Sequence, residues 1–333
     1  MPRQNADPNR LALLRDELLA RNQIERLRSR GEPPSDLLNS RLREASLSSL
    51  LEKLSNETSI VNGDGRGNLQ SAPPEVQDMG ASVALICSKL DLVEPVTPQT
   101  EWKLNSASFL CSGQNFDTEL GVLPRDHIPA TGFLVGASGR HLLTARHAAL
   151  DDYGRLRKDL HCVFGYRQEG TTTVRSFSSS DVIPVLSLVE WGRGEGEDWA
   201  LVDLVASAGR AGLPLRASGV PTQSDPVIAI GHPHGLPVKT GTGILRDVSS
   251  TRYLADLDIS PGNSGSPVIA VDGSGKPLHV EGIIVEALDD LMYVYERECS
   301  VWVNAPDLQV YWASFVPIAK VLADASFQKA VFP

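Results

Sequence analysis

The sequence predicts a mainly β protein of the antiparallel barrel type, with an α-helical extension at its N-terminus. From Trp102 onward, short apolar or alternating runs are separated by Gly, Pro, Asp and Ser, which is typical of antiparallel barrels. The N-terminal part instead repeats leucine at helical spacing. The chain has 333 residues and an apolar fraction of 41%, which allow about two domains and an ample core.

The N-terminal extension is expected to begin with a helix. Asp7 suits the N-cap, Pro8 the first helical position and Gly31 the position after the last turn. A second helix with a leucine stripe is expected after Ser35, so residues 1–58 should form a helical hairpin. Such a hairpin buries little by itself, so its apolar stripe should meet the barrel, another copy or a partner protein. It is either an adaptor or a packed structural extension.

Residues 59–98 are expected to form a linker followed by a third helix. The segment 56–75 is polar and rich in glycine, which is the composition of a flexible linker. From Glu75 to Leu92 apolar residues recur on one side of a helix, and Pro95 would stop it. We therefore expect the barrel part to occupy residues 99–333.

Several strands are expected in this barrel part. The chain should end in a strand that runs into a closing helix. The strands indicated most clearly are Cys162–Tyr166, Val182–Glu190, Val227–Ile230 and His279–Glu286.

Ser264 is a candidate nucleophile, because it stands between two glycines ahead of the apolar run 268–271. Small residues let the backbone turn sharply, so the N–H groups of Gly262 and Ser264 can converge as an oxyanion hole. Gly, Asn, Ser and Pro are also the ordinary residues of tight turns. The motif alone therefore does not decide between a turn and a site.

A serine hydroxyl is a weak nucleophile that needs a base, and His147 is the candidate base. It lies just past the second of two short strands, within 131–136 and 141–147, that a Gly-containing turn joins.

Asp198 is the candidate for the third member of a triad, because it immediately precedes an apolar strand. A carboxylate there would fix the imidazole tautomer and stabilise the imidazolium. The competing acids are Asp203, within the strand, and Glu195 and Glu197, in a repeat typical of solvated loops.

Taken together, these motifs resemble the trypsin-like serine peptidases, in particular the bacterial branch with the high-temperature-requirement proteases and the glutamyl endopeptidases. The chain order His, Asp, Ser is that of the two-barrel peptidases. The resemblance covers about residues 99–333 and implies a chymotrypsin fold of two antiparallel six-stranded β-barrels. It also implies a serine endopeptidase, a hydrolase that forms an acyl-enzyme through His147, Asp198 and Ser264. The matching segments are Thr131-Gly-Phe-Leu-Val, Thr144-Ala-Arg-His147, Asp198-Trp-Ala-Leu, Ala229-Ile-Gly-His-Pro-His-Gly235 and Pro261-Gly-Asn-Ser264-Gly-Ser-Pro267.

Two positions depart from the family pattern. Arg146 stands where many relatives have a small residue. It would either perturb the neighbouring imidazole or, as we expect, point to solvent. Asn263 replaces an aspartate that pairs with a newly freed N-terminus in secreted digestive relatives. Because an amide cannot form that ion pair, activation by N-terminal clipping is not expected.

The resemblance leaves the specificity pocket open. Asp258, six residues before Ser264, stands where trypsin carries its pocket acid and would favour Arg or Lys before the scissile bond. Alternatively, Asp256 matches an acid of the high-temperature-requirement branch that does not read basic residues. The segment Gly282–Ala287, which includes Glu286, would form another wall. Two acids near the pocket would repel a glutamate side chain.

Composition excludes other classes of function. The net charge of −10 disfavours nucleic acid as a partner. No apolar run is long enough to cross a bilayer and the start lacks a signal-peptide pattern, so we expect no membrane partner and a cytoplasmic protein. No cofactor is expected.

Metal and redox sites are not expected either. The four cysteines, Cys87, Cys111, Cys162 and Cys299, lack Cys-x-x-Cys spacing, so all four are expected to be reduced. His232 and His234 lack a further ligand with suitable spacing.

The alternative to an active peptidase is a binding or signalling module whose barrel is latent or a scaffold, with the helices recruiting a partner.

Overall fold

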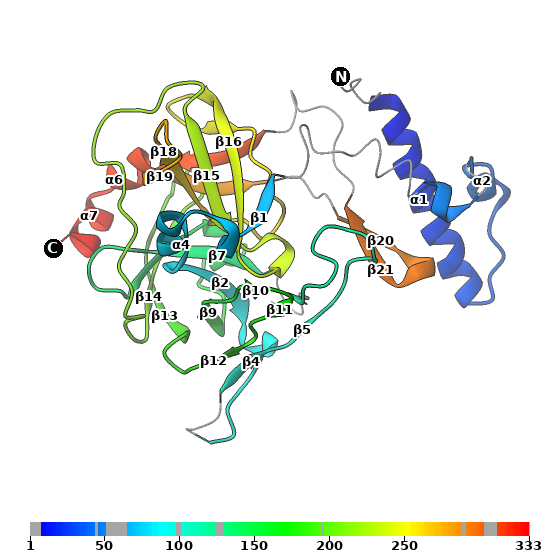
Figure 1. The fold of residues 1–333 in the computed structure, drawn as a ribbon, viewed down its shortest axis with the longest axis horizontal. Coiled ribbons are helices and arrows are strands. Elements are labelled where there is room, and N and C mark those ends of the chain that lie inside the picture. Colours follow the sequence, from blue (N-terminus) through cyan, green and yellow to red (C-terminus); the bar gives the residue numbers. More distant parts are fainter. Residues whose placement is uncertain are drawn as a thin grey trace. The chain divides into compact units, whose positions relative to one another are not determined.

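The computed structural model describes residues 8–43, 46–50, 65–97, 101–123, 129–194, 196–287, 291–302 and 312–332, without the side chains of residues 8–12. The chain folds into two units (Figure 1). The helical unit comprises residues 1–64, 108–118 and 289–311, and the barrel unit comprises residues 65–107, 119–288 and 312–333. None of the described helices is long and apolar enough to span a membrane.

The first barrel of the barrel unit is a closed antiparallel sheet of six strands, in the order β13-β14-β8-β7-β2-β9. Its core contains Phe133, Leu142 and Leu201, all fully buried. Burial on this scale stabilises the fold by about 25 cal/mol for each Å² of apolar surface. The strands are β2 (Val83–Ser88), β7 (Ala130–Val135), β8 (His141–Thr144), β9 (Leu160–Phe164), β13 (Val182–Trp191) and β14 (Ala200–Leu204).

The second barrel is formed by six of the seven strands in the order β1-β16-β15-β18-β19-β22-β17, because β17 pairs with both β22 and β16. The short strand β1 pairs with β16 over residues 239–241, next to the part of β16 that pairs with β17. The strands are β1 (Arg66–Asn68), β15 (Pro226–Gly231), β16 (Lys239–Val248), β17 (Tyr253–Ala255), β18 (Pro267–Val271), β19 (Pro277–Glu286) and β22 (Ala313–Pro317). Both barrels, mostly strands, confirm the predicted fold class.

Shorter elements surround the two barrels. The helices are α4 (Pro74–Gly80), α5 (Arg146–Ala149), α6 (Ile318–Leu322) and α7 (Ala325–Val331), with the 3₁₀ turns η1 (Leu69–Ser71), η2 (Lys89–Asp91) and η3 (Pro233–Gly235). The small sheets pair β12 (Ser176–Phe177) with β4 (Trp102–Leu104) and β3 (Leu92–Val93), β10 (Gln168–Glu169) with β11 (Thr172–Thr173), and β5 (Ser106–Ala107) with β6 (Gly121–Val122).

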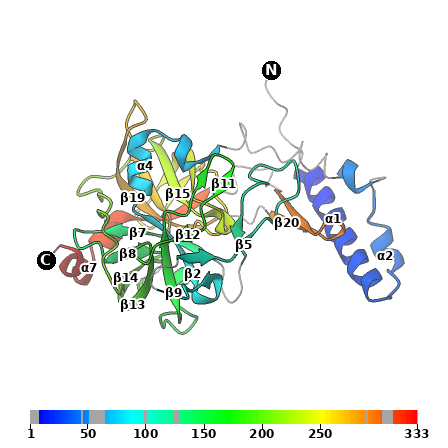
Figure 2. The same ribbon diagram turned by 60° about the horizontal axis from the view of Figure 1, so that its bottom comes forward.

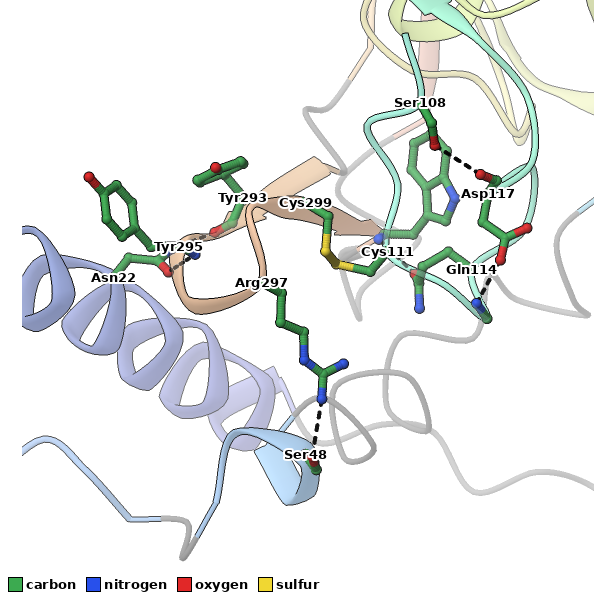
Figure 3. Close-up of a disulfide and its surroundings, with 12 residues drawn as sticks. Asn22, Ser48, Ser108, Cys111, Gln114, Asp117, Tyr293, Tyr295, Arg297 and Cys299 are labelled. Carbon is green, nitrogen blue, oxygen red and sulfur yellow. Dashed lines mark hydrogen bonds between the residues drawn. A yellow bond between two sulfur atoms is a disulfide. The ribbon is translucent and has the colours of Figure 1, made fainter.

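The helical unit packs a helix against a β-hairpin. Helix α1 (Pro8–Ser29) lies beside strand β20 (Figure 1 and Figure 2), and the hairpin consists of β20 (Leu291–Val294), η4 (Tyr295–Arg297) and β21 (Cys299–Trp302). Asn22 joins them, donating to the Tyr293 carbonyl at 2.5 Å and accepting from the Tyr295 N–H at 2.9 Å (Figure 3). The described part of this unit has two small clusters of buried residues. One consists of Leu14, Leu18, Leu47, Leu50, Cys111, Val294 and Val301, and the other of Ala20, Ile24 and Leu38.

The first predicted helix is confirmed, and the second is not continuous. Gly31 follows α1 with a φ of +72°, as expected of a glycine that ends a helix; the predicted cap Asp7 lies outside the described residues. Helix α2 (Asp36–Asn39) ends after one turn. The Ser40 hydroxyl there donates to the Leu37 carbonyl at 2.8 Å, and such side-chain bonds compete with helix propagation.

The third predicted helix is wrong beyond Gly80. Helix α4 ends there, and residues 83–88 form the buried barrel strand β2 instead. An apolar run buried on both faces satisfies helical spacing as well as strand pairing, so periodicity alone could not separate them. The first barrel therefore begins before residue 99.

The prediction of four reduced cysteines is wrong for one pair. Cys111 and Cys299 form a disulfide (Figure 3), whereas Cys87 and Cys162 are free and buried. The loop before Cys111 pairs with β21, since the Cys111 N–H donates to the Ser300 carbonyl at 2.8 Å. The two cysteines are 188 positions apart, so sequence spacing could not reveal the pairing.

Candidate active site

His147 is positioned by the hairpin of β7 and β8. The second strand ends at Thr144, and the next turn of chain is the short helix α5, which carries His147. The Thr144 hydroxyl donates to the Thr131 carbonyl at 2.6 Å, which ties the end of this hairpin to its first strand. The His147 side chain is 48% exposed and so remains accessible to a substrate.

Asp198 holds the His147 ring in one orientation. The ring Nδ1–H donates to Asp198 Oδ2 at 2.7 Å, and the His147 backbone N–H donates to Oδ1 at 3.0 Å. Because Nδ1 carries the proton in this pair, the opposite nitrogen Nε2 presents a lone pair. This is the tautomer that a general base requires.

The Asp198 carboxyl is ionised at neutral pH. Burial by itself raises its pKa, but the hydrogen bonds and charge of His147 outweigh burial, and the Arg146 guanidinium adds to them. The net effect lowers the pKa below its usual value. Arg146 itself donates to the Gly192 carbonyl at 3.1 Å, so it is partly bonded to protein and does not point only to solvent.

The acids that compete with Asp198 have other partners. Asp203 forms an ion pair with Arg140 at 2.6 Å. Glu197 accepts the Gly194 N–H at 2.9 Å, and Glu195 lies outside the described residues. Within the described part of the chain, Asp198 is the acid that contacts the His147 ring.

Ser264 lies in the loop between β17 and β18, and its flanking glycines are required by conformation and space. Gly262 and Gly265 have φ of +97° and +89°, which side chains rarely adopt. A Cβ on Gly265 would lie 2.0 Å from the Thr131 carbonyl oxygen, and one on Gly262 would lie 2.4 Å from the His232 carbonyl oxygen. The sharp turn predicted from these small residues is present.

The backbone N–H groups around Ser264 alternate between bonded and unbonded. The N–H of Asn263 donates to the Ser260 carbonyl at 3.0 Å, and that of Gly265 donates to the Ile284 carbonyl at 2.7 Å. Among the described residues, the N–H groups of Gly262 and Ser264 have no acceptor. Unpaired amides are rare in folded proteins, so these two donors are available to a ligand.

One cavity of about 510 Å³ brings the predicted residues together. His147, Ser264 and Gly262 all line it, and Asp198 contacts His147. The Glu286 side chain is exposed on the same cavity. The remaining lining residues are Pro129, Ala130, Ala148, Arg157, Pro261, Val285 and Ala287.

The other two acids of the predicted pocket do not line this cavity. Asp258 accepts the N–H of Gly65 through Oδ2 at 2.7 Å. Asp256 accepts the Ile244 N–H at 2.6 Å and pairs with Arg246. Both carboxylates fasten backbone or side chains of the second barrel.

The sequence did not single out Arg157 as a site residue. Its guanidinium donates to the His147 carbonyl at 3.3 Å, and its N–H donates to the Ala149 carbonyl at 2.9 Å. It lies in an irregular segment before β9 that contains no motif. Its place at the cavity therefore depends on the hydrogen bond between this segment and Ala149.

Asn263 and His232 are structural neighbours of the site. The Asn263 amide is buried, donates to the Ser260 carbonyl at 3.1 Å and accepts from the Ser266 hydroxyl at 3.3 Å. The His232 ring is buried against Tyr166 and donates through Nδ1 to the Leu236 carbonyl at 3.0 Å. Burial lowers the pKa of His232 to about 4, so its imidazole is neutral at physiological pH.

Residues 130–275 match the sequence model of the trypsin-like peptidase domain. The matched segment includes His147, Asp198 and Ser264. Residues 130–275 therefore form a trypsin-like peptidase domain.

Solved structures with a similar fold include three bacterial or microbial proteins. A serine endoprotease from Yersinia pestis has 15% identity and a TM-score of 0.44, over 76% of this chain and 66% of that one; this chain thus spans just under two thirds of it. An inactive serine-to-alanine mutant from Mycobacterium tuberculosis has 13% identity and a TM-score of 0.44, over 78% and 92%. A thermostable serine protease from an extremophilic microorganism has 11% identity and a TM-score of 0.48, over 76% and 98%. No curated protein matches the chain.

Proposed function

We propose that the chain is a serine endopeptidase, a hydrolase of peptide bonds. In this proposal His147, Asp198 and Ser264 form the catalytic triad, and the N–H groups of Gly262 and Ser264 form the oxyanion hole. The observation that carries the proposal is their arrangement around one cavity. Ser264 and an imidazole oriented by Asp198 line it. The two unbonded amides belong to the same loop as the serine.

The proposed reaction is acyl transfer in two steps. Ser264 Oγ attacks the scissile carbonyl carbon while His147 Nε2 removes the hydroxyl proton. The carbonyl oxygen becomes negative and is stabilised by the two amides, and Asp198 stabilises the imidazolium. His147 then gives its proton to the leaving amine, which departs and leaves an ester on Ser264. Water hydrolyses this ester by the same proton transfers, with water as nucleophile.

The experiment that tests the proposal compares cleavage of a mixed peptide library by the wild type and by Ser264→Ala. We expect the substitution to lower kcat by about 10⁴-fold or more, since removal of a triad member has effects of this size. Ser274→Ala, in an exposed turn outside the cavity, is the matched control and should cleave as the wild type does. Cleavage by Ser264→Ala at the wild-type rate would overturn the proposal.

The same library tests the preference for basic side chains. We propose that Glu286, exposed on the cavity, attracts Lys or Arg near the scissile bond by charge. Glu286→Gln should then lose this preference. Asp258→Asn should retain it, because Asp258 does not line the described cavity. The reverse result would restore the assignment of Asp258 as the pocket acid.

Regulation by a partner through residues 1–58 stays a prediction. The buried side of α1 already contacts the hairpin of its own unit, through Leu14 and Leu18. Leu13 and Leu19 remain exposed, at 46% and 57%, and we propose that a partner would contact these two side chains. Loss of partner binding, without loss of cleavage, on replacing both by serine would support recruitment. Binding and cleavage that are both unchanged would contradict it.

The cytoplasmic location expected from the sequence also stays a prediction. The disulfide between Cys111 and Cys299 favours an oxidising compartment instead, because thiols are kept reduced in most cytoplasms.

A further inference from the structure

The geometry points to Thr131 as a positioning residue whose hydroxyl orients the oxyanion hole. This inference rests on the proposed function, because it concerns the amides of Gly262 and Ser264. Thr131 belongs to strand β7 of the first barrel, and its side chain is fully buried. It reaches across to the nucleophile loop of the second barrel.

The Thr131 hydroxyl bridges two segments of the second barrel. It donates to the Gly262 carbonyl at 2.8 Å and accepts the His232 N–H at 3.0 Å. A carbonyl only accepts and an amide N–H only donates, so the direction of both bonds is fixed. A hydroxyl has both capacities in one atom, and no apolar side chain of the same size has either.

The Thr131 backbone binds the same loop. Its N–H donates to the Ser264 carbonyl at 2.9 Å, and its carbonyl accepts the Thr144 hydroxyl at 2.6 Å. Thr131 therefore holds the carbonyls on both sides of Asn263. The bond from Thr144 links Thr131 to β8, the strand that leads to His147, so one residue connects the base to the nucleophile loop.

The directions of the two proposed donors are set by the carbonyls of Pro261 and Asn263, which share peptides with the N–H groups of Gly262 and Ser264. In a planar trans peptide the C=O and N–H groups point in opposite directions. The Pro261 carbonyl accepts the His234 N–H at 2.6 Å, so the Gly262 N–H points away from His234. The Asn263 carbonyl accepts the Ser266 N–H at 2.8 Å, so the Ser264 N–H, on the same peptide, points away from Ser266.

The Thr131 hydroxyl completes this arrangement at Gly262, where the chain has the greatest freedom. The peptide before Gly262 is held by His234, and the peptide after it is held by Thr131. The bond from His232 to the same hydroxyl also fixes the start of η3, the turn that carries His234. A glycine can turn either peptide at little steric cost. Because oxyanion donors work only when they are oriented in advance, the hydroxyl supplies the constraint that glycine lacks.

The test separates the effect of the Thr131 hydroxyl from that of its methyl group. Thr131→Val keeps the shape and removes the hydroxyl, whereas Thr131→Ser keeps the hydroxyl. We expect Thr131→Val to lower kcat by about 10-fold to 100-fold, less than the loss of a donor itself, with KM changed less than about 3-fold. Thr131→Ser should stay within about 3-fold of the wild type in both. The rate at which a phosphonate labels Ser264 should fall with kcat, because the phosphonyl oxygen occupies the oxyanion hole.

The outcomes separate the inference from the proposed function. Wild-type kcat for Thr131→Val, or equal loss for Thr131→Val and Thr131→Ser, would overturn the inference while Ser264→Ala remains inactive. Cleavage by Ser264→Ala would overturn the proposed function itself. If Thr131→Val does not fold, as judged by its thermal transition, Thr131→Ala and Thr131→Ser form a second pair that differs by the hydroxyl. Equal kcat for that pair would overturn the inference.

Discussion

The barrel unit and the helical unit achieve their structures by different means. In the barrel unit, the strands of each closed sheet form backbone hydrogen bonds with one another. Further backbone hydrogen bonds hold the loop that contains Ser264. The helical unit joins three segments that are distant in sequence around two small clusters of buried residues and a disulfide, as far as its described residues show. We therefore expect the geometry of the proposed site to be independent of this disulfide, whereas the order of the helical unit should depend on it.

The same contrast appears within the proposed site. The Ser264 loop is rich in glycine, so its conformation depends on bonds from the first barrel, above all from Thr131. The orientation of the His147 ring instead depends on one carboxylate, that of Asp198. Each side of the site can therefore be disturbed separately, and neither disturbance should reach the helical unit.

The largest effect is expected from Asp198→Asn. An amide cannot stabilise the imidazolium and favours the wrong tautomer, so kcat should fall by about 10⁴-fold, as measured by peptide hydrolysis. Asp203→Asn, which removes the partner of Arg140 on strand β14, should leave kcat within about 3-fold. Equal losses in the two variants would mean that Asp198 is not the acid of the triad.

Removal of the disulfide is expected to affect the helical unit alone. Cys111→Ser should lower the free energy of unfolding of this unit by about 4 kcal/mol, since cross-links that close long loops constrain the unfolded chain most. Hydrogen exchange of the α1 amides should speed up, while peptide hydrolysis stays unchanged. Adding reductant to the wild type should reproduce the effect and do nothing further to the variant. A fall in peptide hydrolysis would contradict the claim that the disulfide affects the helical unit alone.

Acidification is expected to destabilise the barrel unit through His232. Burial is the main cause that lowers its pKa to about 4. The hydrogen bond to the Leu236 carbonyl raises the pKa, and the positive charge of nearby Lys239 lowers it further. The unfolded chain protonates this histidine near its usual pKa of 6.5, so between pH 6.5 and 4 the unfolded state binds more protons. Stability should therefore fall as the pH drops through this window, by about 3 kcal/mol in total.

The control for this prediction is His232→Phe, which keeps an aromatic ring against Tyr166 and cannot titrate. Its stability, measured by denaturant unfolding at pH 7, 5.5 and 4, should fall less than that of the wild type. Asp198, whose pKa is lowered, is present in both proteins and affects both equally, so it does not contribute to the difference between them. Parallel curves for the two proteins would contradict the assignment to His232.

The sequence predicted the parts of this structure that local patterns determine. Strand alternation located β9, β13, β15 and β19, and the Gly-Asn-Ser-Gly pattern at 262–265 indicated the turn that the structure contains. Local patterns failed where long-range pairing decides. Residues 83–88 form a strand because β7 and β9 lie on either side of them, and no feature near Cys111 indicates Cys299.

The site shows the same limit. The position of Asp258 relative to Ser264 suggested a pocket acid, but its carboxylate accepts a hydrogen bond from the backbone N–H of Gly65, which is distant in sequence. Thr131 stood in a recognised motif, yet its hydroxyl gains meaning only when Gly262 and His232 are brought to it from the other barrel. No sequence motif indicated that Arg157 would line the cavity.

The most direct test of the account is to locate the serine that reacts with a fluorophosphonate, by digesting the labelled protein and sequencing the modified peptide by mass spectrometry. The account predicts a single adduct on Ser264, formed at a rate that falls steeply in His147→Ala and does not change when Cys111 is replaced. An adduct on a different serine, or full-speed labelling of Ser264 without the imidazole of His147, would contradict it.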